Sequence, residues 1–384
     1  MAKDTSSPTK TGIALDDYVL LGNSGLRVSP LCLGAMTFGE SWGIGSNNEE
    51  SKKVFDHYFE KGGNFIDTAC NYNFGESERF LGEYVAGKRS DVVIATKYTA
   101  NVTNMQRSMK KDVRYNPNSG GNHRKSLVEN LDASLKRLNM SYVDILYVHF
   151  YEYRTPIEEF MRSLDDTVRS GKALYVAISD TPSWALSRSN TIADLRGWSQ
   201  FIGLQTRYNL LDRSMEFDLQ PACAEHNIGI IPWGVVAEGF LTGKYKREQI
   251  TDVKSDFRNM QIVKHSKSDK NWKILDEVNA IAKEIGRSPV QVTLNWTMQK
   301  PGITSPLIGA RNIGQLEENL KSLEFKLTPE QMKRLDDVSQ PSEVPFPYGF
   351  FDMMDLNLGK NINVPTRFES LAAKYDFGTY RSLF

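Results

Sequence analysis

The fold is decided by the stretch Ser126-Leu-Val-Glu-Asn-Leu-Asp-Ala-Ser-Leu-Lys-Arg-Leu138, which is followed by Val143-Asp-Ile-Leu-Tyr-Val-His149. In the first part, leucines recur at intervals of four, four and three residues, which is the apolar stripe of an amphipathic helix. The second part is almost continuously apolar, as expected for a strand of a parallel sheet that is buried on both faces. The stretch therefore predicts one helix followed by one buried strand.

The same alternation recurs along most of the chain. Eight apolar, β-prone runs are separated by helical stripes, and this pattern is typical of a closed (β/α)8 barrel or of a long doubly wound sheet. Because there are eight units, the sequence favours an α/β fold of the (β/α)8 TIM barrel type. The predicted strands are Pro30–Ala35, Asn64–Thr68, Val92–Thr96, Val143–His149, Ala173–Ser179, Phe201–Gln205, Ile228–Trp233 and Thr304–Ile308. The other predicted helices are Glu50–Glu60, Ile157–Arg169, Ile274–Ile285 and Leu316–Leu323.

The remaining segments lie outside the repeating units. We expect one barrel domain at 20–338, preceded by a polar N-terminal arm at 1–19 and followed by a C-terminal extension at 339–384. The extension is rich in proline and aromatic residues, and we expect it to lie over the substrate pocket. Two long polar segments, 101–122 and 244–271, are predicted to be loops on the active face of the barrel, because loops of this length are often functional.

Composition excludes several classes of function. The 384 residues contain 47 Lys and Arg and 47 Asp and Glu, so there is no basic excess for binding a nucleic acid. The three cysteines and five histidines are scattered without metal-ligand spacing, so no metal site is expected. No apolar run reaches the roughly 18–20 residues that a membrane helix needs, and the N-terminus lacks the apolar core of a secretory signal. We expect a cytoplasmic protein, a monomer or homo-oligomer, with no nucleic-acid or membrane partner.

Four chemically capable side chains follow three successive strands. Asp67, Tyr72, Lys97 and His149 occupy strand ends or the loops after them, which form the active face of such a barrel. A Lys beside a Tyr is expected to lower the pKa of the phenol, so that it serves as a general acid towards an oxygen that the His orients. Each residue alone also fits a structural role, but their convergence favours carbonyl reduction, and the hydride must come from a cofactor.

These residues carry a resemblance to a known family. Asp67-Thr-Ala-Cys-Asn-Tyr72-Asn-Phe-Gly-Glu-Ser-Glu, Ala95-Thr-Lys97 and Val148-His149 resemble the catalytic tetrad motifs of the aldo-keto reductases. The resemblance runs in order from about Leu20 to about Val338. It implies a barrel that binds NADPH in extended form at its active face, with Tyr72 donating the proton.

The resemblance also implies how the cofactor is bound. Ser179 and Gln205 would hold the nicotinamide carboxamide, and Tyr208 would stack on the ring. The segment from Trp233 to Glu238 would line the pyrophosphate. The further implied cofactor residues are Asp180, Trp233, Gly234, Val235, Val236, Ala237, Glu238, Lys244, Arg258, Gly309, Arg311, Gln315, Glu318 and Asn319.

Two local patterns bear on this assignment. The fingerprint Gly-x-Gly-x-x-Gly is missing after the first strand, whereas Gly309-Ala-Arg311-Asn precedes a helix, where backbone amides and a guanidinium could meet a phosphate together. The resemblance implies that Arg311 faces the 2′-phosphate of the cofactor. The family often has Asn where this chain has Asp180, and a carboxylate accepts hydrogen bonds but does not donate them unless protonated. The contact with the carboxamide is therefore expected to differ.

The expected substrate is an aromatic or apolar carbonyl, because aromatic residues lie near the active face. The predicted pocket residues are Phe38, Trp42, Tyr98, Phe150 and Tyr151. The pattern is most similar to the aryl-alcohol dehydrogenase-like branch, so we expect NADPH-dependent reduction of aldehydes or ketones. The alternative is a regulatory module similar to the potassium-channel β-subunits, which bind NADP(H) in the same barrel. Those subunits typically have Asn at the position of His149, which favours the enzyme.

Overall fold

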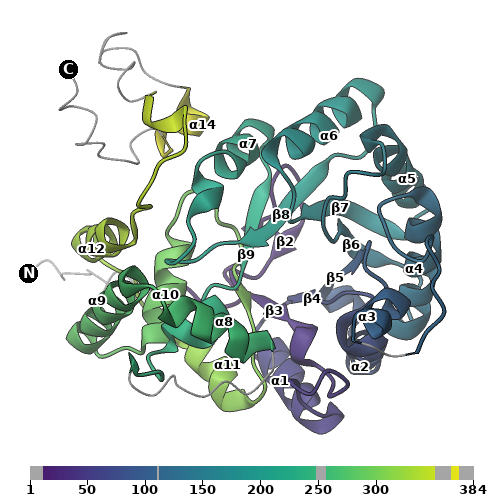
Figure 1. Ribbon diagram of the computed structural model, residues 1–384. Coiled ribbons are helices and arrows are strands. Elements are labelled where there is room, and N and C mark those ends of the chain that lie inside the picture. The colour runs from purple at the N-terminus through teal and green to yellow at the C-terminus, as the bar shows by residue number, and fades with distance from the viewer. Residues whose placement is uncertain (1–11, 110–111, 248–256, 351–364, 372–384) are drawn as a thin grey trace, which may run out of the picture.

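Eight parallel strands form the centre of the molecule, and helices surround them (Figure 1). The computed structural model describes residues 12–109, 112–247, 257–350 and 365–371. The strands are β3 (Cys32–Gly34), β4 (Phe65–Asp67), β5 (Val93–Tyr98), β6 (Val143–Val148), β7 (Ala173–Ser179), β8 (Phe201–Arg207), β9 (Gly229–Trp233) and β10 (Leu307–Ile308). Each strand overlaps one of the eight predicted runs, although β5 and β8 each extend two residues beyond the predicted end, and the predicted (β/α)8 barrel is confirmed.

The sheet closes on itself through the segment before β10. β10 pairs with β3, and each later strand pairs with its predecessor as far as β9. Between β9 and the segment before β10, Ile230 N donates to Gly302 O at 3.1 Å, and Thr304 N donates to Ile230 O at 2.8 Å. The carboxyl ends of the parallel strands therefore meet at one face, where the predicted tetrad lies.

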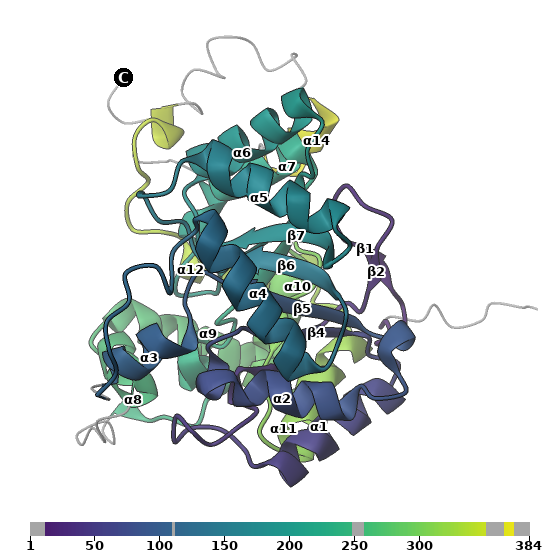
Figure 2. The ribbon, with the colours of Figure 1, turned by 90° about the vertical axis from the view of Figure 1, so that its right-hand side faces the viewer.

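Helices form the outer layer, as Figure 2 shows from the side. Many begin at a capping side chain; for example, Ser288 and Thr328 form capping boxes, with Pro at the first helical position. The helices are α1 (Asn48–Glu60), α2 (Glu76–Tyr84), α3 (Val102–Ser108), α4 (Arg124–Leu138), α5 (Ile157–Arg169), α6 (Ser183–Arg196), α7 (Leu219–His226), α8 (Phe257–Ser266), α9 (Asp269–Ile285), α10 (Pro289–Met298), α11 (Ile313–Leu320), α12 (Pro329–Ser339) and α14 (Thr366–Glu369).

A short hairpin covers the barrel end opposite the active face. It consists of β1 (Val19–Leu20) and β2 (Arg27–Val28), which pair antiparallel, and it was not predicted from the sequence. Leu21 and Val28 are fully buried and belong to the apolar cluster inside the barrel. The hairpin therefore closes the barrel at the amino ends of its strands, and the site lies at the carboxyl ends.

Two predicted loops contain helices. The segment 101–122 contains α3, which begins because the side chain of Asn101 accepts a hydrogen bond from Asn104 N at 2.9 Å. The prediction of an irregular loop was wrong for these seven residues. The segment 244–271 contains α8, and its residues 248–256 lie outside the described part of the chain.

The C-terminal extension leaves the barrel after α12. In its described part, the Tyr348 ring lies 5.5 Å from the Phe217 ring, and Arg367 Nε donates to Glu225 Oε2 at 2.8 Å. These contacts place the described residues against α7 and the turn before it. Its expected position over the substrate pocket stays a prediction.

Candidate active site

The predicted tetrad comes together at the carboxyl ends of β4, β5 and β6. Lys97 Nζ donates to Asp67 Oδ2, to the Thr68 carbonyl oxygen at 2.9 Å, and to the Tyr72 hydroxyl at 3.2 Å. Lys97 and Asp67 are each 1% exposed. Asp67 and Lys97 thus form a buried ion pair, and the ammonium group of Lys97 also donates a hydrogen bond to the phenol of Tyr72, which is partly exposed.

Strand register and a tight turn produce this arrangement. Asp67 is the last residue of β4 and pairs with Ala95, two residues before Lys97 on β5, so both side chains point into the barrel. The other carboxylate oxygen of Asp67 accepts from Gln205 Nε2 at 2.9 Å. Tyr72 begins a short 3-10 turn, Tyr72–Gly75, in which the φ angles of Asn73 and Phe74 are 46° and 54°. Left-handed backbone outside glycine is uncommon and often marks functional sites.

His149 follows β6 and faces the phenol. Its ring centroid lies 5.8 Å from that of Tyr72, at an interplanar angle of 80°. Its backbone N–H donates to Thr99 Oγ1 at 3.2 Å, and Thr99 itself has a φ of 91°. Burial, together with the charge of Lys97, lowers the pKa of His149 to about 3. The imidazole is therefore neutral at physiological pH.

The electrostatics of Tyr72 differ from the expectation. Burial raises the pKa of Tyr72 above its usual value, and the opposing effect of Lys97 is smaller. The expected lowering of the pKa was wrong, because the loss of hydration outweighs the ammonium group. For Lys97, burial opposes the charge, but Asp67 and Tyr72 outweigh it and raise its pKa. Lys97 is thus charged and Tyr72 is a protonated phenol at neutral pH, which is the state a general acid requires.

The predicted nicotinamide residues lie beside the tetrad. Ser179 on β7 pairs with Gln205 on β8, and both side chains are buried. Asp180 is exposed and has a φ of 37°. Its Oδ1 accepts from Trp233 Nε1 at 3.0 Å, so the indole of the next active-face loop orients this carboxylate.

Tyr208 does not fit its predicted role. Its side chain is 0% exposed, its ring stacks on Trp296 with centroids 5.3 Å apart, and its hydroxyl donates to Glu216. No face of the ring is open to a cofactor, so the predicted stacking on the nicotinamide was wrong. Trp233, at the end of β9, is partly exposed at this edge of the site.

The loop after β9 has an unusual backbone. Gly234, Ala237, Glu238 and Gly239 have φ angles of 67°, 47°, 54° and 105°. A right-handed residue followed by a left-handed one, as Val236 (φ −92°) is followed by Ala237, turns successive backbone N–H groups into a concave anion-binding nest. Lys244 Nζ lies near Gly239, 3.9 Å from the position that a Cβ would occupy there. The predicted segment from Val235 and Val236 to Glu238 is therefore suited to a pyrophosphate, and the Glu238 carboxylate is engaged by His265 Nε2 at 2.8 Å.

The turn after β10 forms the other end of the predicted cofactor site. Arg311 is exposed, and its guanidinium has no ion-pair partner among the described side chains. Gln315 and Asn319 hold the turn itself: Gln315 Oε1 accepts from Arg311 N at 2.9 Å, and Asn319 Nδ2 donates to Gly309 O at 3.2 Å. Glu318 is partly exposed on the same helix, α11. These residues fit a phosphorylated nucleotide, since a free guanidinium stands at the start of a helix.

Arg258 cannot be placed in the same way. It is the second residue of α8, but its side chain lies outside the described part of the structure. Its predicted contact with the cofactor stays a prediction.

The five predicted substrate-pocket residues fall into three groups in the structure. The Trp42 ring lies edge-on to Tyr72 with centroids 5.9 Å apart, and Phe150 is 40% exposed with its ring 6.0 Å from His149. Phe38 and Tyr98 are buried in the apolar core instead, so their assignment to the pocket was wrong. Tyr151 belongs to an aromatic cluster on the rim, with its ring 5.0 Å from Tyr153 and 5.6 Å from Trp184.

Two site residues were missed by the sequence analysis. Asn73 and Glu76 hydrogen-bond to the loop that carries Trp42. The signal was available, because Asn73-Phe-Gly75 directly follows Tyr72, and Asn and Gly are the residues that most readily adopt a left-handed backbone.

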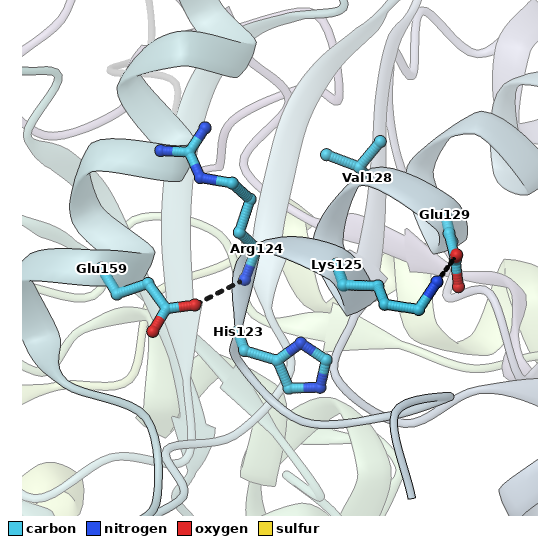
Figure 3. A pocket seen from close by; sticks show the side chains of 6 residues that line it. All are labelled: His123, Arg124, Lys125, Val128, Glu129 and Glu159. Atoms are coloured by element: carbon cyan, nitrogen blue, oxygen red, sulfur yellow. Dashed lines mark hydrogen bonds and ion pairs between the residues drawn. The ribbon is translucent and has the colours of Figure 1, made fainter. Parts of the chain in front are cut away.

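Two of the hollows on the surface of the described residues bear on where the site lies. One, of about 590 Å³, is lined by residues of the first turns of α4 and by Glu159 (Figure 3). Arg124 N donates to Glu159 there, Lys125 pairs with Glu129, and no tetrad residue takes part. The other, of about 470 Å³, is lined by Asp180, Arg207 and Trp233 and therefore adjoins the predicted nicotinamide site. The candidate active site therefore comprises the tetrad and the second hollow, because only this hollow is lined by residues predicted to contact the cofactor.

Two further findings concern metals and membranes. Within the described ranges, no three His, Cys, Asp or Glu side chains are grouped so that they could hold a metal ion. None of the helices in those ranges is both long and apolar enough to cross a membrane.

Comparison with known proteins agrees with this geometry. Residues 30–340 match the family model described as "Aldo/keto reductase family". The chain is 37% identical over 331 residues to norsolorinic acid reductase B of Aspergillus parasiticus, which covers 85% of this chain and 84% of the relative. It is 34% identical over 360 residues to an aryl-alcohol dehydrogenase [NADP(+)] of Phanerodontia chrysosporium, with 91% and 92% covered. A putative aryl-alcohol dehydrogenase of Saccharomyces cerevisiae is 35% identical over 338 residues, with 86% and 87% covered.

Proposed function

The chain belongs to the aldo/keto reductase family, and on this premise we propose that it reduces aromatic or apolar aldehydes and ketones to alcohols, with Tyr72 as the general acid. It is an NADP(H)-dependent oxidoreductase by family. The observation that carries the assignment of Tyr72 is the hydrogen-bonded series Asp67, Lys97 and Tyr72, which ends beside a neutral His149.

Each member of the tetrad has a distinct task. NADPH, when bound, supplies a hydride to the carbonyl carbon. Tyr72 donates its hydroxyl proton to the carbonyl oxygen as negative charge develops there. Lys97 stabilises the phenolate that remains, Asp67 balances the buried ammonium, and His149, which does not carry a positive charge, orients the oxygen. Solvent then reprotonates Tyr72.

The cofactor would lie across the loops after β7, β8, β9 and β10. Ser179, Asp180 and Gln205 would meet the nicotinamide end, with Trp233 as the partly exposed aromatic residue beside it. Lys244 and the left-handed loop would face the pyrophosphate, and Arg311 would face the 2′-phosphate. The unpaired guanidinium and the left-handed backbone support this placement.

The names of the relatives support an aromatic substrate. One is named for an aryl alcohol and NADP(+), and another is named a norsolorinic acid reductase. The aromatic side chains of Trp42 and Phe150 beside Tyr72 and His149 suit a planar substrate. The same relatives give no support to the alternative of a channel-subunit-like regulatory module.

A direct assay tests this proposal. Purified protein is given NADPH with benzaldehyde and a panel of aromatic and aliphatic carbonyls, and the loss of NADPH absorbance is followed. We expect steady-state turnover that falls by about 100-fold or more in Tyr72→Phe, since general acid catalysis contributes about that much. Tyr18→Phe, at the far end of the barrel, is the control and should leave the rate unchanged. Absence of turnover on every substrate would contradict the proposal.

A further inference from the structure

The turn that carries Tyr72 also holds the loop that carries Trp42. Asn73 follows Tyr72, and its side chain is fully buried. Its Oδ1 accepts from Trp42 N at 3.0 Å, and its Nδ2 donates to the carbonyl oxygens of Met36 and Phe38 at 2.9 and 3.2 Å. One side chain therefore makes three hydrogen bonds to the loop between β3 and α1.

Glu76 fixes the same loop from the next turn. Its Oε2 accepts from Glu40 N at 3.0 Å, from Ser41 N at 3.3 Å and from the Ser41 hydroxyl at 3.0 Å. Gly39 lies directly against both side chains, since a Cβ added there would be 2.5 Å from Glu76 Oε2 and 2.8 Å from Asn73 Cβ. The loop therefore rests on Asn73 and Glu76 without intervening side chains.

The hydrogen bonds determine where the indole stands. Trp42 N is bonded to Asn73, the residue next to Tyr72. The Trp42 ring lies edge-on to the rings of Tyr72 and Phe74, with centroid distances of 5.9 and 6.5 Å and interplanar angles of 78° and 79°. The indole of Trp42 thus lies beside the reactive hydroxyl of Tyr72. Because Asn73 holds the backbone of Trp42, the distance between the indole and this hydroxyl depends on Asn73.

A left-handed backbone alone does not explain this asparagine. Asn139 and Asn227 have similar φ angles of 52° and 50°, and they end α4 and α7 at exposed positions. Neither uses its side chain in a described hydrogen bond, whereas Asn73 (φ 46°) uses both ends of its amide. Glycine at this position would adopt the left-handed backbone but would lack the three hydrogen bonds that the Asn73 side chain makes to the loop.

We propose that Asn73 is a positioning residue for substrate selection, which fixes Trp42 beside Tyr72 and so favours flat aromatic carbonyls over small aliphatic ones. The proposal rests on the proposed function. It assigns selectivity to a side chain that faces away from the substrate and acts through the loop.

Asn73→Gly tests the proposal, because glycine accepts the left-handed backbone and removes only the three hydrogen bonds. We measure kcat and KM for benzaldehyde and for propanal at saturating NADPH. The ratio of kcat/KM for benzaldehyde to that for propanal should fall about threefold to tenfold, as expected for the loss of one aromatic contact, mainly through KM. The propanal values should change by less than about twofold.

Two controls separate selection from general damage. Asn139→Gly makes the same substitution at the same backbone geometry and should leave the ratio unchanged. In a Trp42→Ala background, Asn73→Gly should have no further effect on the ratio, since the two residues act together. If Asn73→Gly does not fold, Glu76→Ala frees the loop from its other side and should lower the ratio in the same direction.

The outcomes distinguish the two levels of the argument. If the unmodified enzyme reduces neither aldehyde nor any other carbonyl, the proposed function fails. If it reduces both, and the ratio is unchanged in Asn73→Gly or falls equally in the Trp42→Ala background, the role of Asn73 is overturned.

Discussion

In the proposed reaction the chemistry depends on a single residue, Tyr72, and two opposing influences act on its proton. Burial favours the neutral phenol, and the ammonium of Lys97 at 3.2 Å favours the phenolate. Burial is the larger effect, so the pKa of Tyr72 lies above its ordinary value. The ion pair with Asp67 keeps Lys97 charged, so the phenolate is still stabilised when the proton leaves.

This balance predicts different pH dependences for the two directions of the reaction. Carbonyl reduction needs the phenol, which is present at every pH below the raised pKa, so kcat/KM for reduction should be nearly flat between about pH 6 and pH 8. Alcohol oxidation needs the phenolate and should rise about tenfold per pH unit over the same range. Because the pKa of His149 is about 3, its protonation should not limit either direction there. Initial rates with benzaldehyde and with benzyl alcohol measure both profiles. An oxidation rate that is independent of pH would show that Tyr72 is not the group that titrates.

Residue by residue, the sequence predicted which side chains of the proposed tetrad lie together better than it predicted which aromatic residues lie beside them. Strand ends are recognisable, so Asp67, Lys97 and His149 could be assigned to one face. The direction of side chains was predicted less well. Because side chains alternate along β5, Tyr98 must point outward to the helices if Lys97 points into the barrel. The burial of Tyr208 against Trp296 depends on a helix nearly 90 residues later in the chain, and no local pattern indicates it.

At the level of elements, a strand is easy to predict when both of its faces are buried, because its sequence is then an almost continuous apolar run. Most residues of the eight barrel strands are buried, and all eight strands were found. The hairpin of β1 and β2 has only two residues in each strand, too few for a periodic signal. α3 was missed because Asn and Ser residues around it are also typical of loops, and its cap at Asn101 decides the outcome locally.

A buried ion pair joins the turn after β8 to the C-terminal helices. Arg213 donates to both oxygens of Glu216 at 3.0 Å, and also to Asp336 O and Ser339 Oγ of α12 at 2.9 Å. Burial opposes the charge of Glu216, but Arg213 outweighs it and lowers the pKa of Glu216 to about 2. The pair therefore holds α12 against the barrel next to the buried Tyr208.

Removing one partner of this pair should destabilise the protein strongly. Glu216→Gln removes the buried counter-charge of Arg213 and leaves it only the partly exposed carboxylate of Asp336 at 3.6 Å, and we expect the free energy of unfolding to fall by about 3 kcal/mol. Urea unfolding followed by circular dichroism measures the change. Glu129→Gln, which breaks the exposed pair with Lys125, should cost less than about 1 kcal/mol. If the two substitutions lowered the free energy of unfolding equally, burial would not be what makes the pair of Arg213 and Glu216 important for stability.

Across the whole molecule, equal numbers of positive and negative residues conceal an uneven distribution. The net charge is zero, yet Lys244 and Arg311 stand on the active face without an ion-pair partner among the described residues. The barrel brings these two cations, which are 67 residues apart in the chain, to neighbouring loops after β9 and β10. A neutral protein can therefore bind an anionic dinucleotide at one face.

The last prediction concerns the choice between NADPH and NADH. Arg311→Ala should raise KM for NADPH by about 10- to 100-fold, because a charge-assisted contact with the 2′-phosphate contributes about 1.5–3 kcal/mol. KM for NADH, which has no 2′-phosphate, should change by less than about threefold, and the NADPH effect should shrink at high salt as the charges are screened. Arg27→Ala removes an exposed arginine at the opposite end of the barrel, so it controls for the loss of one positive charge and should leave both KM values unchanged. An equal rise for the two cofactors in Arg311→Ala would place Arg311 near a group that both share, such as the pyrophosphate, and the 2′-phosphate would then have to be held by another residue of the turn.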